Sequence, residues 1–368
     1  MIRHELFKPS EPFIYDQSSF FRRYQPVFIS RSRHRDSAVP PGAEMVGAGS
    51  TSLWGRLKYA VLMDTRSLEH LIHESGAKLV HAHFGPEGMF SRRAVERLGL
   101  PHVVSLYGYD VTVSGIALFR SGRPSLMHYA VGRHALFRNG STFVCQSEHL
   151  RTRAVQMGLD MERAVVIPVG VDTLEFAPTA VPSEPVIVHV ARLVEKKGTS
   201  DLIRAFRIVS KKIPDSRLVI VGDGPLRPEL SSLAEDLGVA DRVSFLGTLQ
   251  RSSSVDEIRK GMVFCLPSVT STSGDQEGLP QVLLEAGSLG RPVIATLHSG
   301  IPEGVLDGES AHLVSERSPY ELAEALVYVL SNARVAQEMG TAGRNFVLRN
   351  FDVRQQSAKV EALYDSLL

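Results

Sequence analysis

From residue 78 onward, short apolar runs alternate with longer segments in which apolar residues recur every three or four positions. Short runs that end in Gly, Pro or Ser predict buried strands, and the longer spacing predicts amphipathic helices. The expected strands are 78–83, 102–106, 142–145, 164–168, 186–191, 217–221, 243–246, 262–266 and 292–296. The expected helices are 87–98, 148–157, 199–211, 227–237, 255–260, 281–289 and 353–368. Strands separated by helices predict parallel sheets in an α/β fold.

The alternation is interrupted at 176–185, where three prolines occur without any periodicity. Such a segment is typical of a linker. Two arrays of strands and helices in tandem predict two Rossmann-like domains that face each other across a cleft. We therefore expect an N-terminal domain at 1–178, a C-terminal domain at 179–350 and a last amphipathic helix within 351–368.

The start of the chain departs from this pattern. Residues 2–7 make a poor strand because His, Glu and Arg interrupt the apolar positions, and no glycine occurs before Gly42. The pattern favours a helix at 19–24 and a strand at 26–30. We expect a short or degenerate first βα unit, either because its strand is abbreviated or because the start is trimmed.

Composition narrows the class of protein. The 368 residues are 43% hydrophobic and 22% charged, as in globular proteins with a substantial core. The two cysteines, Cys145 and Cys265, lie in separate halves within apolar runs. This pattern argues against a disulfide framework and a metal site, and it favours a reducing cytosol. We expect no signal peptide and no spanning helix, and therefore a cytoplasmic location.

The net charge of +1 is unevenly distributed. Basic residues outnumber acidic ones within 1–178, and the reverse holds for the remainder. A basic half favours an anionic partner such as a lipid surface, a phosphorylated acceptor or nucleic acid, although ordinary surface composition explains it equally well. Because the basic residues are not interleaved with stacking aromatics, we expect no nucleic acid partner.

Two carboxylates bracket the start of an expected helix in the stretch EGLPQVLLE, which runs from Glu277 to Glu285. Pro280 suits the first turn, where a missing N–H costs nothing, and Gly278 and Leu279 would present free N–H groups at the positive helix end. A carboxylate accepts two hydrogen bonds from a vicinal diol. One glutamate could therefore bind a ribose and the other a pyranose, while the alternative is two solvated helix charges.

Two further loops follow predicted strands. Arg192 and Lys197 lie between a strand and a helix, where two cations make a good diphosphate site, although they could equally be solvated loop charges. Gly222 and Gly224 follow the strand RLVIV and are candidates for nucleotide binding. The third glycine of the dinucleotide fingerprint is missing, so a tight structural turn has about equal support.

The motifs together resemble those of the retaining glycosyltransferases of family 4. The C-terminal signature is carried by Glu277 and Glu285 with EGLP, LLEA and GRPVIAT. Other segments resemble the family in the same order: VIPVGVDTLEF, VARLVEKKGTSDLIRAF, LVIVGDGP and RVSFLGTL. The segments VHAHFGPEG and SLYGYDVT are similar to its N-terminal domain, closest to bacterial exopolysaccharide (colanic-acid-type) members. The resemblance covers roughly 78–368.

The resemblance implies a GT-B fold, with an N-terminal acceptor domain, a C-terminal nucleotide-sugar domain and a last helix that crosses back. It implies that Glu285 binds the nucleotide ribose and that Glu277 holds the hydroxyls of the donor sugar. Arg192 and Lys197 would bind the diphosphate and stabilise the leaving charge. No metal and no other cofactor is expected, and retention would follow from same-face attack with the leaving phosphate taking the proton of the acceptor.

The acceptor side departs from the family pattern. The family often has His-Gly before an aspartate, whereas this chain has Tyr107, Gly108 and then Asp110. Tyrosine can hydrogen-bond but does not become a cation near neutral pH. His81 and His83 share one face of a strand. We expect these two beside the acceptor; a metal role lacks a third ligand, and simple packing is the alternative.

The expected function is transfer of a hexose from a UDP- or GDP-sugar to a growing, lipid-linked oligosaccharide, in exopolysaccharide or cell-surface glycan synthesis. The basic segments 22–35 and 120–138 could contact an anionic membrane at its cytoplasmic face. Two alternatives stay open: a non-catalytic nucleotide-sugar-binding protein on the same scaffold, and a GT-B epimerase or phosphorylase.

Overall fold

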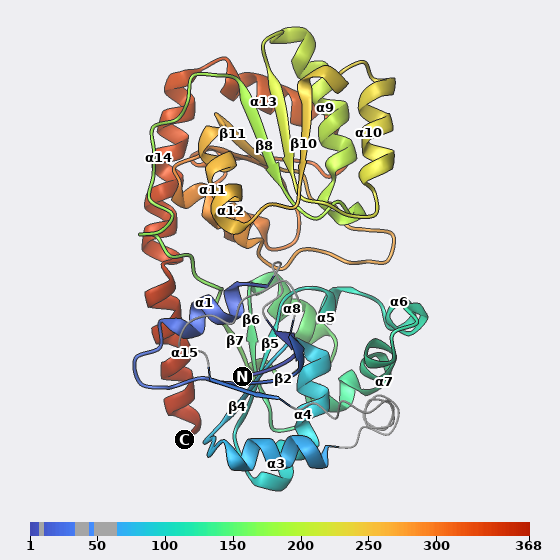
Figure 1. The fold of residues 1–368 in the computed structure, drawn as a ribbon, viewed down its shortest axis with the longest axis vertical. Coiled ribbons are helices and arrows are strands. Elements are labelled where there is room, and N and C mark those ends of the chain that lie inside the picture. The colour runs from blue at the N-terminus through green and yellow to red at the C-terminus, as the bar shows by residue number, and fades with distance from the viewer. Residues whose placement is uncertain (7–10, 34–43, 48–64) are drawn as a thin grey trace. The chain divides into compact units, whose positions relative to one another are not determined.

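The computed structural model describes residues 1–6, 11–33, 44–47 and 65–368. The described chain forms two compact units (Figure 1). The N-terminal unit comprises Met1–Gly170 with Val353–Leu368, and the C-terminal unit comprises Val171–Asp352. Each unit contains one sheet of parallel strands joined through helices, which confirms the α/β class and the two Rossmann-like halves.

Within the described residues, the N-terminal sheet has the strand order β3-β2-β1-β4-β5-β6-β7. Its strands are β1 (Ile2–Leu6), β2 (Val27–Arg33), β3 (Glu44–Gly47), β4 (Val80–His83), β5 (His102–Leu106), β6 (Thr142–Cys145) and β7 (Ala164–Val166). Its helices are α1 (Phe13–Ser19), α3 (Arg66–Glu74), α4 (Gly85–Leu98), α5 (Tyr109–Thr112), α6 (Gly115–Arg120), α7 (Pro124–Arg138) and α8 (Glu148–Gln156). Strands β2 and β4–β7 confirm the predicted strands in this part of the chain.

Strand β1 differs from the sequence-based expectation. It is a regular strand that pairs with both β2 and β4. Its Arg3 is buried, and the guanidinium donates to both carboxylate oxygens of Glu11 at 2.8 Å and to Glu87 at 2.7 Å. Because these charge-assisted bonds offset the cost of burying the cation, an interrupted apolar pattern still forms a strand. The prediction of a poor strand was wrong, and so was the helix at 19–24, since α1 ends at Ser19.

Helix α7 was not predicted from the sequence, for a physical reason. Arg133 occupies one of its inward positions, between the buried Tyr129 and Leu136, and so breaks the apolar periodicity. The guanidinium donates to the carbonyl oxygen of Val113 at 3.0 Å, which satisfies part of its hydrogen-bonding capacity. A helix that buries a paired arginine does not show a clean apolar stripe.

The C-terminal sheet has the strand order β10-β9-β8-β11-β12-β13. Its strands are β8 (Val186–Val190), β9 (Arg217–Val221), β10 (Val243–Gly247), β11 (Val263–Leu266), β12 (Val293–Thr296) and β13 (Ala311–Val314). Its helices are α9 (Thr199–Lys212), α10 (Arg227–Asp236), α11 (Arg251–Lys260), α12 (Gln281–Ser288), α13 (Pro319–Leu330) and α14 (Ala333–Asn350). The predicted strands and helices between 186 and 296 are confirmed, α11 being longer by about a turn.

Both faces of this sheet are covered, which is why its strands are almost wholly apolar. Ile187 and Cys265 point into a core with α9, α10 and α13. Their strand neighbours Val188 and Phe264 point into a second core with α11, α12 and α14. Successive side chains on a strand face opposite sides, so β8 and β11 each contribute to both cores.

Helix α15 (Val353–Leu367) belongs to the N-terminal unit although it follows the C-terminal unit in sequence. Its Glu361 is 3% exposed, and one carboxylate oxygen accepts the backbone N–H groups of Arg22, Arg23 and Tyr24 at 2.6–3.2 Å. Its Tyr364 packs edge-on against Phe21. These contacts hold the last helix against the loop that follows α1.

The boundary between the units lies at Gly170 and Val171 rather than at residue 178. Val171 forms a bridge with Asp352, and Phe176 is fully buried in the core beside α12 and α14. Arg344 donates to the carbonyl oxygen of Phe176 at 3.1 Å. The proline-rich stretch after Phe176 is therefore part of the C-terminal unit and does not link the two units.

Candidate active site

The candidate site of the C-terminal unit lies where the strand order of its sheet reverses. The loop after β8 and the loop after β11 leave neighbouring parallel strands at their carboxyl ends, the usual ligand site of open α/β sheets. Gly198 has a φ of +64°, and a Cβ there would lie 1.8 Å from the carbonyl oxygen of Pro267. Only glycine allows the two loops to approach this closely.

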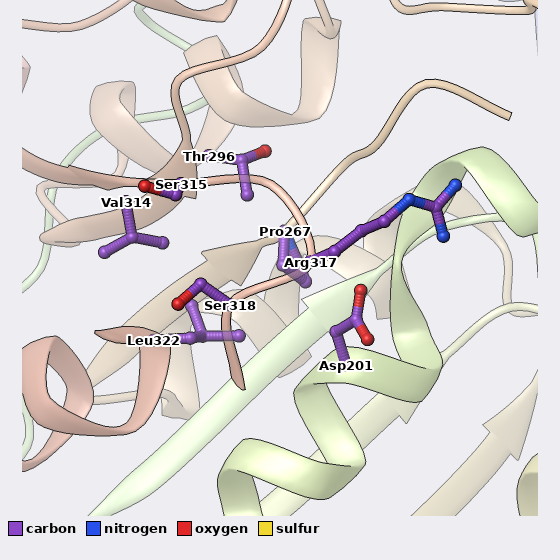
Figure 2. A pocket seen from close by; sticks show the side chains of 8 residues that line it. All are labelled: Asp201, Pro267, Thr296, Val314, Ser315, Arg317, Ser318 and Leu322. Carbon is purple, nitrogen blue, oxygen red and sulfur yellow. The ribbon is translucent and has the colours of Figure 1, made fainter. Parts of the chain in front are cut away.

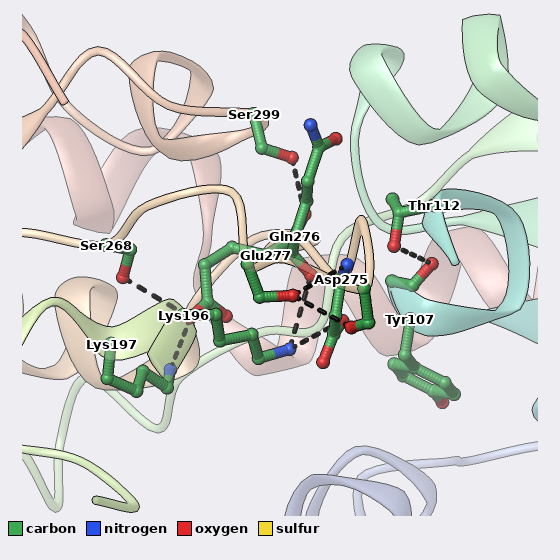
Figure 3. A network of polar contacts seen from close by, with 12 residues as sticks. Tyr107, Thr112, Lys196, Lys197, Ser268, Asp275, Gln276, Glu277 and Ser299 are labelled. Carbon is green, nitrogen blue, oxygen red and sulfur yellow. Dashed lines mark hydrogen bonds and ion pairs between the residues drawn. The ribbon is translucent and has the colours of Figure 1, made fainter. Parts of the chain in front are cut away.

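Glu277 and Lys197, which the sequence analysis assigned to one pocket, are in direct contact. The Lys197 Nζ lies 2.7 Å from the Glu277 Oε1, and Ser268 donates to the same oxygen at 3.3 Å (Figure 3). Burial by itself raises the pKa of Glu277, but the charges of Lys197 and Lys196 lower the pKa to about 2. Glu277 is therefore a buried carboxylate that stays ionised at neutral pH.

The loop before Glu277 is fastened by the loop after β8. Lys196 Nζ lies 3.1 Å from the Asp275 carboxylate and donates to the carbonyl oxygen of Gln276 at 3.2 Å (Figure 3). Glu195 accepts the N–H of Thr272 at 3.0 Å and its hydroxyl at 2.9 Å. The segment that carries Glu277 is thus held by consecutive side chains of the opposite loop.

Sequence reasoning missed the residues that hold the backbone of Glu277. The N–H of Glu277 donates to His298 Nε2 at 3.2 Å. The carbonyl oxygen of Glu277 accepts the hydroxyl of Ser299 (Figure 3). His298 Nδ1 lies 2.6 Å from the Glu316 Oε1. The available signal was position, because His298 and Ser299 follow the carboxyl end of β12, and β12 pairs with β11.

Glu285 lies on α12, about one helix turn after the loop that carries Glu277. Its Oε1 is 3.4 Å from Arg251 of α11, and its side chain is 13% exposed. The Arg251 guanidinium also covers the ring of Phe176 at 5.0 Å. Gly278 is buried, and the partly buried Leu279 packs against the hydrophobic core to which α12 contributes. The helix itself begins at Gln281, which places Pro280 at the N-cap.

Arg192, Gly222 and Gly224 lie on adjoining loops. Arg192 follows β8 and its side chain is exposed. A Cβ on Gly222 would lie 1.9 Å from the carbonyl oxygen of Ala191, and one on Gly224 would lie 2.4 Å from that of Leu193. These glycines therefore let the loop after β9 pack on the loop that carries Arg192, which gives them a structural role whether or not they contact a nucleotide.

The predicted acceptor residues form a connected, buried network in the N-terminal unit. His83 Nδ1 lies 2.7 Å from the hydroxyl of Tyr107, and His81 lies 2.6 Å from the hydroxyl of Tyr364 and 2.8 Å from that of Ser105. Burial lowers the pKa of His81 to about 3 and that of His83 well below its usual range. Both imidazoles are neutral, and their place at an acceptor stays a prediction.

Gly108 and Asp110 shape the turn after β5. Gly108 has a φ of 151° and precedes α5. The Asp110 carboxylate accepts the N–H groups of Gly85 and Tyr107, each at 2.8 Å. Burial raises the pKa of Asp110 to about 6, although these two bonds oppose the rise. Asp110 therefore ties the loop after β5 to the start of α4.

Two negative observations apply to the described residues. No three His, Cys, Asp or Glu side chains there gather as metal ligands, and no helix there is long and apolar enough to cross a bilayer. A shallow recess lies beside the carboxyl ends of β12 and β13, and none of the predicted site residues lines it (Figure 2). Its lining residues are Asp201, Pro267, Thr296, Val314, Ser315, Arg317, Ser318 and Leu322.

Comparison with known families finds two matches that together span most of the chain. Residues 171–346 match the model of glycosyl transferases group 1, and residues 22–170 match the glycosyl transferase 4-like domain. The chain is 31% identical over 361 residues to a Mycolicibacterium smegmatis GDP-mannose-dependent alpha-(1-6)-phosphatidylinositol monomannoside mannosyltransferase, with 92% of this chain and 88% of that protein aligned. It is 37% identical over 249 residues to WcaL of Escherichia coli K12, a protein named for colanic acid biosynthesis.

The part aligned with WcaL is 67% of this chain and 59% of WcaL, so this chain spans less than two thirds of that relative. Among solved structures, Anabaena HepE in complex with UDP is similar over 100% of this chain and 99% of that chain, with a TM-score of 0.78 and 20% identity. WaaG, a glycosyltransferase involved in lipopolysaccharide biosynthesis, matches with a TM-score of 0.72 and 18% identity, over 98% and 97% of the two chains. These likenesses identify the fold as GT-B.

Proposed function

Because this chain belongs to the group 1 glycosyltransferases with a glycosyl transferase 4-like N-terminal domain, we propose that it transfers a hexose, with retention of configuration, from a nucleotide diphosphate sugar to a lipid-linked oligosaccharide. The product would serve exopolysaccharide or cell-surface glycan synthesis. The observation that carries the proposal is the ion pair of Glu277 and Lys197 at the switch point of the sheet.

Each charged group of the site has a task in this reaction. Glu277 is ionised and offers its carboxylate to the hydroxyls of the donor sugar. Lys197, 2.7 Å away, and the exposed Arg192 supply positive charge for the diphosphate as it leaves. Glu285 accepts hydrogen bonds from the ribose hydroxyls. With two cations placed in this way, we expect transfer without a divalent metal ion.

The names of the relatives support a choice of donor. The mycobacterial relative is named for GDP-mannose, and HepE was solved with UDP and with UDP-glucose. We propose a UDP- or GDP-hexose as the donor.

In the N-terminal unit, Tyr107 stands where the family often has histidine, and the Tyr107 hydroxyl is hydrogen-bonded to His83. The acceptor side must therefore work with a neutral hydrogen-bonding group.

Peripheral contact with an anionic membrane is part of the proposal, and α6 with the turn after it supports this. Ile116 and Phe119 are 68% and 52% exposed, and Arg120 and Arg123 beside them are exposed as well. Apolar side chains flanked by cations suit the interface of an anionic bilayer. Part of the other basic segment, 22–35, lies outside the described residues. The cytoplasmic face is the expected location.

Release of UDP or GDP tests the function directly. Purified protein is incubated with UDP- and GDP-hexoses, with and without a lipid-linked saccharide, and both nucleotide and glycolipid are measured. Acceptor-dependent release with an α-linked product from an α-linked donor supports the proposal. Tight donor binding without turnover would instead support a binding protein, and donor conversion without glycolipid would support an epimerase or phosphorylase. Glu277→Gln serves as the inactive control.

Membrane contact is tested by flotation with vesicles of phosphatidylglycerol and phosphatidylcholine at low salt. The double variant I116S/F119S should lose most binding to anionic vesicles. Tyr320→Ser, which changes an equally exposed side chain of the C-terminal unit, should bind as the native protein does. Equal flotation of native protein and double variant would contradict the membrane proposal.

A further inference from the structure

The backbone of Glu277 is held at both ends by a pair of residues that no expected role explains. His298 Nε2 accepts the N–H of Glu277 at 3.2 Å. Ser299 donates its hydroxyl to the carbonyl oxygen of the same residue (Figure 3). We propose that His298 and Ser299, backed by Glu316, are positioning residues that orient Glu277 toward the donor sugar. This inference rests on the proposed transferase function.

The protonation pattern of His298 follows from its partners. A backbone N–H can only donate, so the Nε2 that faces Glu277 carries no proton. The proton therefore lies on Nδ1, which donates to the Glu316 Oε1 at 2.6 Å. The His298 side chain is 0% exposed, so bulk water does not compete for either bond. One tautomer of a neutral imidazole satisfies both neighbours.

Glu316 is itself anchored, which makes the arrangement stiff. It accepts the N–H of Thr270 at 2.8 Å and the Thr270 hydroxyl at 3.4 Å. Burial raises the pKa of Glu316, but the hydrogen bonds from Thr270 and His298 outweigh burial and lower the pKa. An ionised Glu316 thus fixes the His298 ring in the way that a carboxylate fixes an imidazole in many sites.

Ser299 adopts a backbone conformation that serine rarely takes. Its φ is +51°, in the left-handed region. Such conformations are costly and persist where the surrounding contacts enforce them. This conformation places the Ser299 hydroxyl against the carbonyl oxygen of Glu277, while the preceding residue, His298, accepts the N–H of Glu277.

The consequence for the reaction is a fixed carboxylate. Lys197 and Ser268 bind the side chain of Glu277, while His298 and Ser299 bind its peptide groups. Without the backbone bonds, the carboxylate could rotate with its loop and still keep the ion pair. Small errors in the placement of a substrate-binding group can lower turnover by about 100-fold.

The test compares His298→Ala with His298→Gln, whose side-chain carbonyl oxygen reaches about as far as Nε2 and can accept the N–H of Glu277. We expect kcat of His298→Ala to fall about 10- to 100-fold, while the Kd for UDP or GDP alone changes by less than about twofold. His298→Gln should recover most of kcat. His312→Ala is the matched control, because His312 packs on Tyr328 of α13.

Equal losses in the alanine and glutamine variants, or a loss of nucleotide affinity as large as the loss of kcat, would overturn the inference. If the native protein transfers no sugar, the proposed function fails instead, and the inference is then decided by nitrogen NMR of histidine-labelled native protein. That spectrum should show His298 protonated on Nδ1. Protonation on Nε2 would contradict the inference whatever the activity, including the case in which His298→Ala does not fold.

Discussion

Replacement of Lys197 by methionine tests the charge balance at Glu277, because methionine keeps most of the apolar stem and removes the cation. The two side chains are 15% and 7% exposed, and their charged atoms are 2.7 Å apart. Burial by itself raises the pKa of Glu277, so the value of about 2 depends on the neighbouring lysines. In Lys197→Met the pKa of Glu277 should rise toward its ordinary value of 4.5, although the charge of Lys196 still lowers it.

The magnitude follows from linkage between protonation and folding. A carboxyl whose pKa is lowered on folding stabilises the protein above its ordinary pKa, and that contribution is lost as pH falls through the folded-state value. For Glu277, the interval from 4.5 to about 2 corresponds to about 3 kcal/mol at neutral pH. Because Lys196 remains, Lys197→Met should lose up to about 3 kcal/mol at pH 7, and the loss should shrink as pH falls from 4.5 toward 2.

Urea denaturation at several pH values measures this difference, and carbon NMR of the glutamate carboxyls, assigned with Glu277→Gln, measures the titration itself. Lys260→Met is the matched control, because it removes an ion pair with Glu257 whose lysine is 66% exposed. That variant should stay close to native stability. A stability difference that is constant from pH 7 to pH 3, or a native Glu277 that titrates near 4.5, would refute the reasoning.

Three further changes have expected outcomes. Glu285→Ala should weaken UDP or GDP binding by about tenfold or more in calorimetry, since hydrogen bonds to a carboxylate contribute about 1.5–3 kcal/mol. Gly198→Ala should lower stability by about 3 kcal/mol in urea, because a 1.8 Å clash adds to its φ of +64°. Gly238→Ala, with the same φ and open space, should lose only about 1 kcal/mol. Glu361→Ala orphans three N–H groups and should cost about 2–4 kcal/mol, visible as a lower Tm, while Asp365→Ala should change the Tm less.

The local pattern of apolar residues was enough to predict most strands of both sheets, for a physical reason. Strands buried on both faces, such as β8 and β11, need apolar residues at nearly every position, so they appear as continuous runs. The site was also readable in part. Lys197 and Glu277 each follow a buried strand, and the carboxyl ends of neighbouring parallel strands lie at one edge.

The sequence could not determine which polar residues far apart in the chain contact each other. Arg3 interrupts the apolar pattern of β1, and one of the carboxylates that pair with it, Glu87, lies 84 residues away. His298 gave no sign of its contact with Glu277, because a hydrogen bond between a ring nitrogen and a backbone N–H leaves no spacing or periodicity to detect. The sequence by itself determined two α/β halves and brought out the carboxylate and the cation of the candidate site, Glu277 and Lys197. Only the tertiary structure decided which buried polar groups satisfy one another, since burial makes each such group depend on a partner that the chain supplies from elsewhere.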